Sequence, residues 1–403
     1  MNVLVITNLY PLKNNPTSGI FITNRLRKYS DLQVKYTAVA IAFRESKPLK
    51  FIKDLTKKSM VEPVRERENV SYLPTYVERN FFDALETRAG FYKHFYKKWM
   101  PRYKTIEQQL KNYGLEKFDI IHAHGMYMPV PAGFVAYEIS RSLKIPFIVT
   151  VHGSDINYQM KNKLLRPYYL EVLENASKVI FVSKALLDKA INFGYSGKNY
   201  QIIPNGFDDE IFRPMDKTKV RKELGIYHPD FKYVGFVGNL VYVKRADKLP
   251  KIFKFISNEV KNTIFLIVGD GPLKSKLEKE LKKYNAIFSG RVPHEKVAQY
   301  MNAMDVMLLP SRSEGWPCVV LEAQACGTCV IGSNNGGIPE AIGFNEYVVE
   351  DGNGFEERFA QRVIKVLKDG YNESELIERT REYTWLNVVQ KELNLYKETL
   401  ARR

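Results

Sequence analysis

Short apolar runs alternate with longer stretches of helical periodicity along this chain, and this alternation limits the fold more than any other feature of the sequence. Such runs suit strands that are buried on both faces, and strands separated by helices form parallel sheets. The predicted strands of the first half span 3–7, 34–42, 119–123, 147–151 and 178–182. Those of the second half span 233–237, 264–268, 286–288, 306–309 and 329–332. The pattern predicts an α/β fold with two doubly wound, Rossmann-like sheets.

The two series of strands predict two domains, as expected for a chain of 403 residues. The boundary is expected in the segment IPNGFDDEIFRP at 203–214, where Pro, Asn and Gly favour turns. We therefore predict a first domain over 1–203 and a second over 204–377. Ligands of open α/β sheets bind outside the carboxyl ends of the strands, so two facing sheets predict a cleft between the domains.

A helix is predicted at the carboxyl end of the chain, over about 378–403. Apolar residues recur there at helical spacing, namely Trp385, Val388, Val389, Leu393 and Tyr396. We expect this crossover helix to pack back on the first domain.

The composition argues against a membrane-spanning protein. The longest apolar runs, such as 37–43 and 264–269, are far below the roughly 18 residues that cross a bilayer. The sequence opens on a strand-like run rather than a signal peptide, so we expect a cytoplasmic protein that acts there or at the inner face of the plasma membrane.

The three cysteines, Cys318, Cys326 and Cys329, are expected to be reduced thiols, because so few cannot stabilise a chain of this length. The segment CGTC at 326–329 resembles a redox motif. It falls where a helix is predicted to end, and that pole of a helix does not lower the pKa of a thiol. We expect no redox role for it.

The formal net charge of +16 predicts an anionic partner. Nucleic acid is disfavoured, because the basic residues are dispersed and no nucleic-acid-reading module is present. The densest patch lies within 87–106, where aromatic residues are interleaved with Arg88, Lys93, Lys97, Lys98, Arg102 and Lys104. Such a segment suits docking on anionic lipid headgroups, and it equally suits a helix whose aromatic residues pack on its own domain.

Two carboxylates frame a predicted helix over 317–326, within the stretch SRSEGWPCVVLEAQACG. Glu314 precedes this helix and Glu322 lies in its second turn. Pro317 suits the first turn because it has no amide proton to leave unpaired. The free amides at the helix start, those of Gly315, Trp316 and Cys318, favour an anion such as phosphate. Carboxylates beside a phosphate seat suggest a sugar nucleotide, whereas a purely helix-stabilising role for the two glutamates stays open.

Three other loops follow predicted strands and carry candidate site residues. Gly19 precedes a helix and allows close backbone approach to an anion. His152 ends a strand, where its imidazole can exchange a hydrogen bond or proton with a substrate hydroxyl. A third loop carries Asn239, Lys244 and Arg245, and cations at a helix start are favourable if they share a bound diphosphate. A plain loop, a satisfied histidine and a solvated basic face are the respective alternatives.

Several motifs occur in one order along the chain: VHGSD, IPNGFD, VGNLVYVK, IVGDGP, FSGRVP, EGWPCVVLEA and NGGIPE. Together with Gly19 they resemble the retaining glycosyltransferases of family 4, and most of all bacterial surface-polysaccharide members. The resemblance runs from the first strand to the YTWLNVV helix, and it is looser between 35 and 118. It implies the GT-B architecture of two facing Rossmann-like domains, with the first domain on the acceptor side and the second binding the donor.

The resemblance also implies roles for the matched positions. Glu314 would hold hydroxyls of the donor sugar, Glu322 the ribose hydroxyls and Lys244 the diphosphate. The backbone near Arg291 and Val292 would frame the base, while amides from Gly315 through Pro317 to Cys318 would face phosphate and sugar. His152 would lie beside the reacting sugar and Gly19 near the leaving phosphate.

The chain departs from the family pattern at three positions. Asn239 stands where many members have Arg, and Arg245 stands where Gly is usual, so Arg245 is expected to take over part of the diphosphate contact. Cys329 stands where Pro is common, and we expect that change to affect packing only.

The expected activity is transfer of a hexose from a UDP- or GDP-sugar to a lipid-linked or polysaccharide acceptor. No Asp-x-Asp motif is present, so no metal and no other cofactor is expected, and Lys244 with helix dipoles would stabilise the leaving group. The resemblance implies retention of anomeric configuration. A sugar-nucleotide epimerase or phosphorylase of the same architecture, and a catalytically silent partner of a polysaccharide assembly complex, remain alternatives.

Overall fold

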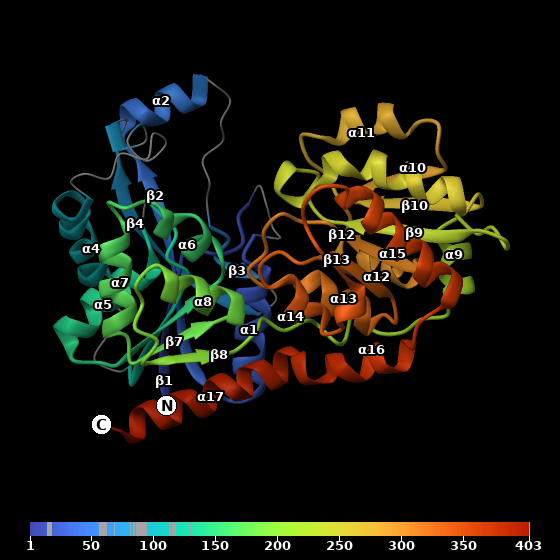
Figure 1. Cartoon of the computed structure of the whole chain (residues 1–403). Coiled ribbons are helices and arrows are strands. Elements are labelled where there is room, and N and C mark those ends of the chain that lie inside the picture. The colour runs from blue at the N-terminus through green and yellow to red at the C-terminus, as the bar shows by residue number, and fades with distance from the viewer. Residues whose placement is uncertain are drawn as a thin grey trace. The chain divides into compact units, whose positions relative to one another are not determined.

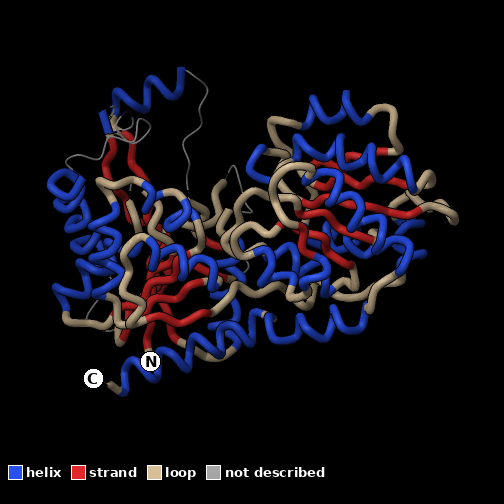
Figure 2. The backbone as a smooth tube through the Cα atoms, viewed as in Figure 1, coloured by secondary structure: helices blue, strands red, loops and turns tan. Residues whose placement is uncertain are grey.

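The computed structural model describes residues 1–13, 18–55, 63–67, 69–80, 82–83, 85, 95–112, 114, 118–128 and 130–402. The chain divides into two compact units. The first comprises Met1–Pro204 together with Val388–Arg403, and the second comprises Asn205–Asn387. Each unit is a parallel sheet with helices on its faces, as Figures 1 and 2 show.

The described strands of the first unit form an eight-stranded sheet in the order β3-β4-β2-β1-β5-β6-β7-β8. The strands are β1 (Asn2–Thr7), β2 (Lys35–Glu45), β3 (Glu66–Arg67), β4 (Val70–Arg79), β5 (Ile120–His124), β6 (Phe147–Val151), β7 (Lys178–Phe181) and β8 (Tyr200–Ile202). The helices are α1 (Ile20–Asp31), α2 (Lys47–Leu55), α4 (Phe95–Lys111), α5 (Ala132–Leu143), α6 (Ser154–Asn157), α7 (Arg166–Asn175) and α8 (Lys184–Asn192), with a 3-10 turn, η2 (Gln159–Lys161). All these strands pair in parallel except β3.

All five strands predicted for this unit are present, each within a few residues of its predicted bounds. The sequence reading missed β4, which contains Pro74. Proline lacks the amide that a strand interior normally needs. On the side away from β2, β4 pairs only through Val70 and Ser71 with the short β3, so in the described sheet Pro74 lies in an edge position that tolerates it.

The second unit contains a six-stranded parallel sheet in the order β11-β10-β9-β12-β13-β14. Its strands are β9 (Lys232–Val237), β10 (Thr263–Val268), β11 (Ala286–Gly290), β12 (Val306–Leu309), β13 (Cys329–Ser333) and β14 (Val348–Val349). The helices are α9 (Lys217–Glu223), α10 (Leu249–Glu259), α11 (Lys274–Leu281), α12 (His294–Ala303), α13 (Cys318–Ala325), α14 (Ile338–Ile342), α15 (Phe355–Asp369) and α16 (Glu373–Thr380), and short 3-10 turns include η3 (Tyr242–Lys244) and η4 (Ala246–Lys248). Apolar residues of β9, β10, α10 and α15 form its main core.

The last helix, α17 (Trp385–Ala401), begins in the second unit and continues in the first. The five apolar residues that define its periodicity are all buried. The segment 378–387, expected with the first domain, instead groups with the second unit. Arg379 holds it there, donating to Gln324 Oε1 at 3.0 Å and to the Glu340 carbonyl at 2.8 Å.

Residues 87–94 of the basic and aromatic segment lie outside the described residues. Arg88 and Lys93 lie there, and of Lys97 and Lys98 only the backbone is described. In the described part of α4, Tyr103 and Ile106 are buried, and Arg102 pairs with Asp83 at 2.8 Å. This end of the segment packs on its own unit.

Candidate functional site

An ion pair lies at the topological switch point of the second sheet. The first strand of this sheet, β9, lies between β10 and β12, so the connections after β9 and β12 leave the sheet in opposite directions. Lys244 follows β9 and Glu314 follows β12, and Lys244 Nζ lies 2.5 Å from Glu314 Oε1. Their side chains are 26% and 12% exposed. A switch point outside the carboxyl ends of parallel strands is where open α/β sheets bind ligands.

Glycines bring the backbones of three loops together at the same sheet edge. A Cβ at Gly269 would lie 2.0 Å from the Gly238 carbonyl oxygen, and a Cβ at Gly271 would lie 2.6 Å from that of Leu240. The amide of Gly269 donates to the carbonyl of Gly290 at 2.9 Å. The edge therefore consists of backbone packed too closely for any side chain.

Three of the sequence-predicted residues lie in or next to these loops. Asn239 follows Gly238, while Arg291 and Val292 follow Gly290 at the end of β11. Arg291 is exposed and Val292 is half-buried. The structure thus places all three at the carboxyl edge of the sheet that also carries Lys244.

The NGGIPE segment supports the backbone of Glu314. Gly336 has φ +60°, and a Cβ there would lie 2.2 Å from the Glu314 carbonyl oxygen. The Gly337 amide donates to the same oxygen at 3.2 Å. Asn335 donates to the Ser311 carbonyl at 3.2 Å and to Asp351 Oδ2 at 3.1 Å. This loop therefore holds the approach to α13 in place.

Helix α13 begins one residue later and ends one residue earlier than predicted, with Pro317 as its N-cap residue. Gly315 and Trp316 precede it, and Cys318 is its first residue. The Trp316 side chain is buried and donates from Nε1 to the Asn205 carbonyl at 3.0 Å. This side chain anchors the loop, so only the backbone of Trp316 is left to contact a ligand.

Glu322 lies in the second turn of α13 with a half-buried side chain. Burial, followed by the charge of the nearby Asp208, raises the pKa of Glu322 to about 7. Asp208 comes from the FDDE segment of the predicted domain boundary and is itself buried. Two carboxyl groups thus lie near each other in a poorly solvated place, where one is readily protonated.

Arg245 is buried, and its guanidinium is paired with residues other than Glu314. Its Nη2 lies 2.6 Å from both carboxylate oxygens of Asp351, and its Nη1 donates to the Pro310 carbonyl at 3.2 Å. The guanidinium also lies 4.3 Å from the centre of the Phe355 ring. Burial raises the pKa of Asp351, but hydrogen bonds from Arg245 and Asn335 outweigh it and lower the pKa to about 2. In this structure Arg245 therefore holds the loop after β14, rather than presenting its charge for a diphosphate.

His152 directly follows β6 in the first unit and is half-buried. Its amide donates to Asp155 Oδ2 at 3.0 Å, and the Gly153 amide donates to Asp155 Oδ1 at 2.8 Å. Burial and then the charge of Arg25 hold the pKa of His152 well below its usual value. The imidazole is neutral at neutral pH, with one protonated ring nitrogen.

Gly19 is the N-cap residue of α1, with φ +61°. A Cβ at this position would lie 2.5 Å from the carbonyl carbon of Leu9 and the nitrogen of Tyr10. Asn8, at the end of β1, donates to the carbonyls of Tyr127 and Val130 at 2.9 and 3.2 Å. The loops after β1 and β5, which flank the switch point of the first sheet, are thereby joined.

Sequence reasoning missed three acidic or amide groups of the site in the second unit: Asp208, Asn335 and Asp351. Asp208 and Asn335 lie within the quoted motifs IPNGFD and NGGIPE, so the motifs contained the signal. Asp351 lies just after β14, a strand of two residues that is too short to be predicted from an apolar run.

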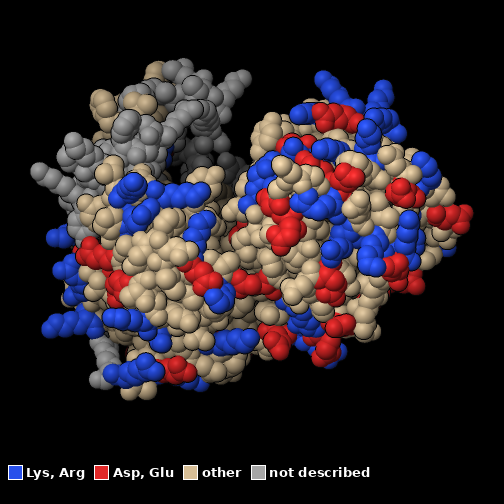
Figure 3. Space-filling model, viewed as in Figure 1, with Lys and Arg blue, Asp and Glu red and all other residues tan. Residues whose placement is uncertain are grey.

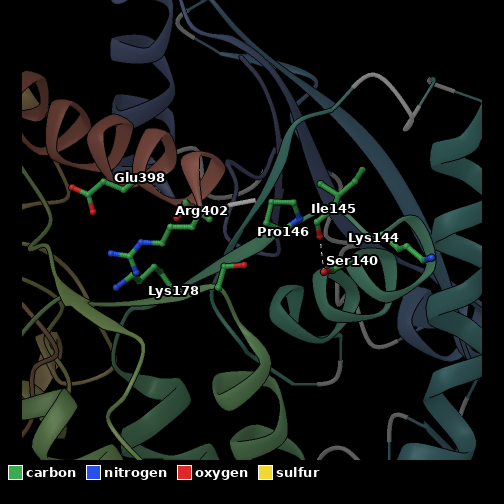
Figure 4. A pocket seen from close by; sticks show the side chains of 9 residues that line it. Ser140, Lys144, Ile145, Pro146, Lys178, Glu398 and Arg402 are labelled. Atoms are coloured by element: carbon green, nitrogen blue, oxygen red, sulfur yellow. Dashed lines mark hydrogen bonds between the residues drawn. The ribbon is translucent and has the colours of Figure 1, made fainter.

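A pocket of about 430 Å³ lies elsewhere in the first unit, as Figure 4 shows. Its lining includes Ile145, Pro146 and Lys178, which lie at the amino ends of β6 and β7. His152 lies at the opposite end of β6. The pocket is therefore on the wrong edge of the sheet for the candidate site.

The cysteines are free thiols, and Cys326 and Cys329 are buried. Burial raises the pKa of both thiols. Among the residues that the structure describes, no group of three or more His, Cys, Asp or Glu side chains is arranged to hold a metal ion. No described helix is long and apolar enough to cross a membrane.

Two Rossmann-like units in one chain, each with polar residues at the carboxyl ends of its strands, are the architecture of the GT-B fold class. A family model described as glycosyl transferases group 1 matches residues 216–383, and one described as glycosyltransferase family 4 matches 72–211. The chain belongs to glycosyltransferase family 4.

Two bacterial relatives show the same relationship. The chain is 30% identical to TuaC of Bacillus subtilis, a glycosyltransferase assigned to teichuronic acid biosynthesis, over 87% of this chain and 85% of TuaC. It is also 30% identical to the N-acetyl-alpha-D-glucosaminyl L-malate synthase of Bacillus anthracis, over 66% of this chain and 70% of that protein.

Solved structures share the fold at lower sequence identity. HepE of Anabaena in complex with UDP has a TM-score of 0.72 and 17% identity, covering 99% of this chain and 100% of HepE. Sucrose-phosphate synthase of Thermosynechococcus elongatus has a TM-score of 0.70 and 18% identity, and both chains are covered fully.

Proposed function

We propose that this protein transfers a hexose from a UDP- or GDP-sugar to a lipid-linked or polysaccharide acceptor in cell-surface polysaccharide biosynthesis, with retention of anomeric configuration. The observation that carries the proposal is the Lys244–Glu314 pair at the switch point of the second sheet. A cation and a carboxylate 70 residues apart in sequence meet at the edge where such sheets bind nucleotides.

Each partner of this pair matches one part of a nucleotide sugar. Lys244 would contact the diphosphate as a point charge, and Glu314 would accept hydrogen bonds from hydroxyls of the donor sugar. In the ligand-free protein the charges of Lys244 and Glu314 neutralise each other. A bound nucleotide sugar would replace this ion pair with contacts between Lys244 and the diphosphate and between Glu314 and the sugar hydroxyls. Their partial exposure leaves room for this exchange.

Glu322 would accept the ribose hydroxyls, and the amides at the start of α13 would face the phosphates. The close glycine loops, with Asn239, Arg291 and Val292 beside them, would form the wall against the base. The contacts of Arg245 fit a supporting role, because its guanidinium is already paired with Asp351.

The proposed chemistry needs no protein nucleophile. The bond between the anomeric carbon and the diphosphate oxygen breaks, and a bond from the acceptor hydroxyl oxygen to the same carbon forms on the same face. The acceptor proton passes to the leaving diphosphate, whose charge Lys244 and the helix dipole stabilise. His152 would lie beside the reacting sugar, and the backbone at Gly19 near the leaving phosphate.

The comparisons support a donor and a class of product. The structure of HepE contains UDP, which favours a uridine nucleotide, and TuaC is assigned to the synthesis of a surface polymer. We propose that the first unit binds the acceptor. A peripheral contact of the segment 88–104 with anionic lipid at the inner face of the plasma membrane belongs to the same proposal, since a lipid-linked acceptor would be presented there.

The distribution of charged side chains in Figure 3 favours binding of anions at particular sites and not over the whole face shown. Lys and Arg are interspersed with Asp and Glu over this view, and they do not merge into one uniform basic face. A protein that binds nucleic acid along its length would present a continuous basic stripe.

Release of nucleoside diphosphate tests the proposal. Purified protein is incubated with UDP- or GDP-sugars, with and without lipid-linked acceptors, and the nucleotide product is quantified. Release that requires an acceptor supports transfer, and the anomeric proton coupling of the product reports retention. Epimerisation without an acceptor, or donor binding without turnover, would instead identify an epimerase or a silent partner.

A further inference from the structure

Arg245 has a backbone conformation that residues other than glycine seldom adopt. Its φ is +53°, in the left-handed region, where a Cβ crowds the following carbonyl oxygen. Among the residues that the structure describes, three others that are not glycine have a positive φ, namely Gln33, Asn69 and Lys144, and all three are exposed. Arg245 is buried, with 6% of its surface exposed. A buried residue persists in such a conformation only where its surroundings hold it there.

The guanidinium of Arg245 makes contacts that can hold it. Nη1 donates to the Pro310 carbonyl at 3.2 Å, directly after β12, and Nη2 lies 2.6 Å from both carboxylate oxygens of Asp351, just after β14. Hydrogen bonds with a charged partner are roughly twice as strong as those between neutral groups. Arg245 directly follows Lys244 in the loop after β9, so its side chain joins that loop to the loops after β12 and β14.

Asn335 extends these contacts to the segment that precedes α13. Its side chain donates to Asp351 Oδ2 at 3.1 Å and to the Ser311 carbonyl at 3.2 Å. The Ser333 hydroxyl donates to the same carbonyl at 2.6 Å. Side chains from the loops beside it therefore fix the chain three residues before Glu314.

The loops that carry Lys244 and Glu314 also contact each other through their backbones. The Arg312 amide donates to the Val243 carbonyl at 2.8 Å. The Arg312 side chain donates from Nε to the Tyr242 carbonyl at 3.2 Å. The position of one loop against the other therefore determines where the two charged groups of the ion pair lie.

We propose that Arg245 is a positioning residue, which fixes the loop of Lys244 against the loop of Glu314 through its contacts with the loops after β12 and β14. Both charged groups are thereby held in place before a donor binds. The alternative is direct contact between Arg245 and the diphosphate, for which the guanidinium would have to leave Asp351. This inference rests on the proposed function, because only donor binding at the ion pair gives the loop positions a consequence for transfer.

Hydrogen–deuterium exchange tests the positioning role without a substrate. Arg245→Gly removes the guanidinium and suits the left-handed φ, so this variant is expected to fold. Amides of the segment 310–316, including that of Arg312, should exchange about tenfold faster than in the wild type, because the loop opens more readily. Unchanged exchange of this segment would overturn the proposal.

Steady-state kinetics distinguish positioning from direct contact with the diphosphate. Arg245→Gly should lower kcat by about tenfold to a hundredfold, with a smaller change in donor KM, since misplaced groups lose most in the transition state. Asp351→Asn keeps the size of the side chain without its charge and should also lower kcat. The double variant should be no worse than Arg245→Gly alone, because both changes break one network. If Asp351→Asn instead keeps or raises turnover and donor affinity, a released Arg245 contacts the diphosphate and the proposal is wrong.

Arg245→Lys tests the geometry of the contact. A lysine keeps the positive charge, but its single ammonium cannot reproduce the planar fork that contacts Pro310 and Asp351 together. We therefore expect Arg245→Lys to recover only part of the kcat that Arg245→Gly loses. Full activity in Arg245→Lys would show that a point charge is sufficient, which contradicts the positioning role.

Gly225→Ala is the control for loss of stability within the same unit. Gly225 has φ +69°, and a Cβ there would meet nothing within 4 Å. Alanine at this position should lower the free energy of unfolding through backbone strain and leave kcat unchanged. An equal fall of kcat in Gly225→Ala and Arg245→Gly would assign the loss to stability and overturn the proposal.

The two proposals fail in different ways. Absence of transfer with every donor and acceptor would refute the proposed function, while exchange of the segment 310–316 would still decide whether Arg245 fixes the loop. Transfer by the wild type with an unchanged kcat in Arg245→Gly would keep the function and overturn the positioning role. If Arg245→Gly does not fold, Asp351→Asn and Arg245→Lys provide both measurements.

Discussion

At the residue scale, the two glutamates of the EGWPCVVLEA motif lie in different surroundings although they are only eight positions apart. Glu314 is paired with Lys244, whereas burial and Asp208 raise the pKa of Glu322 to about 7. The same side chain type therefore forms an ion pair at one position and lies in a poorly solvated place at the other.

Substitution of the two glutamates should affect different steps. Glu314→Gln removes a carboxylate that competes for Lys244, so we expect donor affinity to be kept while turnover falls by about a hundredfold. Glu322→Gln should weaken nucleotide binding by about tenfold, with a smaller effect on turnover. Calorimetric titration with the nucleoside diphosphate and steady-state kinetics measure the two effects. Equal loss of affinity in both variants, with turnover intact, would contradict this division of roles.

The pKa of Glu322 predicts how binding depends on pH. Ribose hydroxyls bind the ionised carboxylate, so affinity for a nucleotide sugar should fall roughly tenfold per pH unit below about 7. Glu322→Gln should remove this dependence. Calorimetric titrations with the nucleotide at several pH values between about 5 and 8 measure it, because this range includes the pKa of about 7. A wild-type affinity that stays constant across this range would be incompatible with a titrating Glu322.

The same shift predicts the sign of a stability effect. The folded-state pKa of Glu322 lies above the ordinary value of 4.5, so folding favours its protonated form. The stability that protonation provides is complete below about pH 4.5 and is lost as the pH rises through about 7. Glu322→Gln should therefore stabilise the protein at high pH, by at most about 3 kcal/mol and by less in practice because the carboxyl is partly exposed.

At the element scale, the glycine loops at the carboxyl edge of the second sheet depend on contacts between backbones. Gly269 and Gly352 share a positive φ, at +135° and +112°. A Cβ at Gly269 would lie 2.0 Å from the Gly238 carbonyl oxygen, while a Cβ at Gly352 would meet nothing within 4 Å. Substitution at the two positions therefore separates the free-energy cost of a positive φ from the cost of a steric clash with the neighbouring loop.

Alanine at these two glycines should have unequal effects. Both variants have the strain of a positive φ, roughly 1–3 kcal/mol, and only Gly269→Ala must also displace the loop after β9. We expect Gly269→Ala to lower the free energy of unfolding further and to weaken nucleotide binding, in contrast to Gly352→Ala. Urea unfolding and nucleotide titration of the matched pair provide the measurement, and identical results would show that the close approach is unimportant.

The attachment of α17 is also an element-scale feature. Arg25 in α1 and Glu392 in α17 form an ion pair, with 2.9 Å between Nε and Oε1, and both side chains are fully buried. Tyr29 adds a hydrogen bond to Glu392 Oε2 at 3.2 Å and another to the Tyr396 hydroxyl. Buried polar groups of α17 are thus paired with polar groups of α1.

Loss of one charge of this pair should be far more costly than loss of both. Arg25→Met leaves Glu392 buried and unpaired, so we expect a loss of about 3–5 kcal/mol in unfolding free energy. Addition of Glu392→Leu should recover most of it. Lys365→Ala at the exposed Lys365–Asp369 pair serves as the control and should change stability by less than about 1 kcal/mol. Urea unfolding monitored by circular dichroism compares these variants, and a mild effect of Arg25→Met would contradict the buried-pair argument.

At the scale of the whole molecule, the leaving diphosphate has two sources of stabilisation in the proposed mechanism, Lys244 and the amide end of α13. Neither requires a divalent ion. We therefore expect transfer to persist in excess chelator and to be unchanged by added magnesium or manganese. Abolition by the chelator with rescue by manganese would show that a metal has the role assigned here to Lys244.

The sequence by itself determined the sheets and the loops that carry the site. Apolar runs of strand length, separated by helical stretches, predicted all ten strands named for the two units, because burial on both faces requires such runs. Motif order predicted Glu314, Lys244 and His152 in loops that follow the carboxyl ends of strands, and Glu322 in the helix after Glu314. These features are local, so residue spacing is enough to predict them.

Only the tertiary structure decided which charged and polar groups meet. Lys244 pairs with Glu314, Arg245 with Asp351 and Arg25 with Glu392, over 70, 106 and 367 residues of chain. The periodicity of a sequence predicts which face of its own helix or strand a residue lies on. It does not predict which other element packs against that face. Protonation states follow from burial and from those long-range partners, which is why the charge of Glu322 depends on the folded chain.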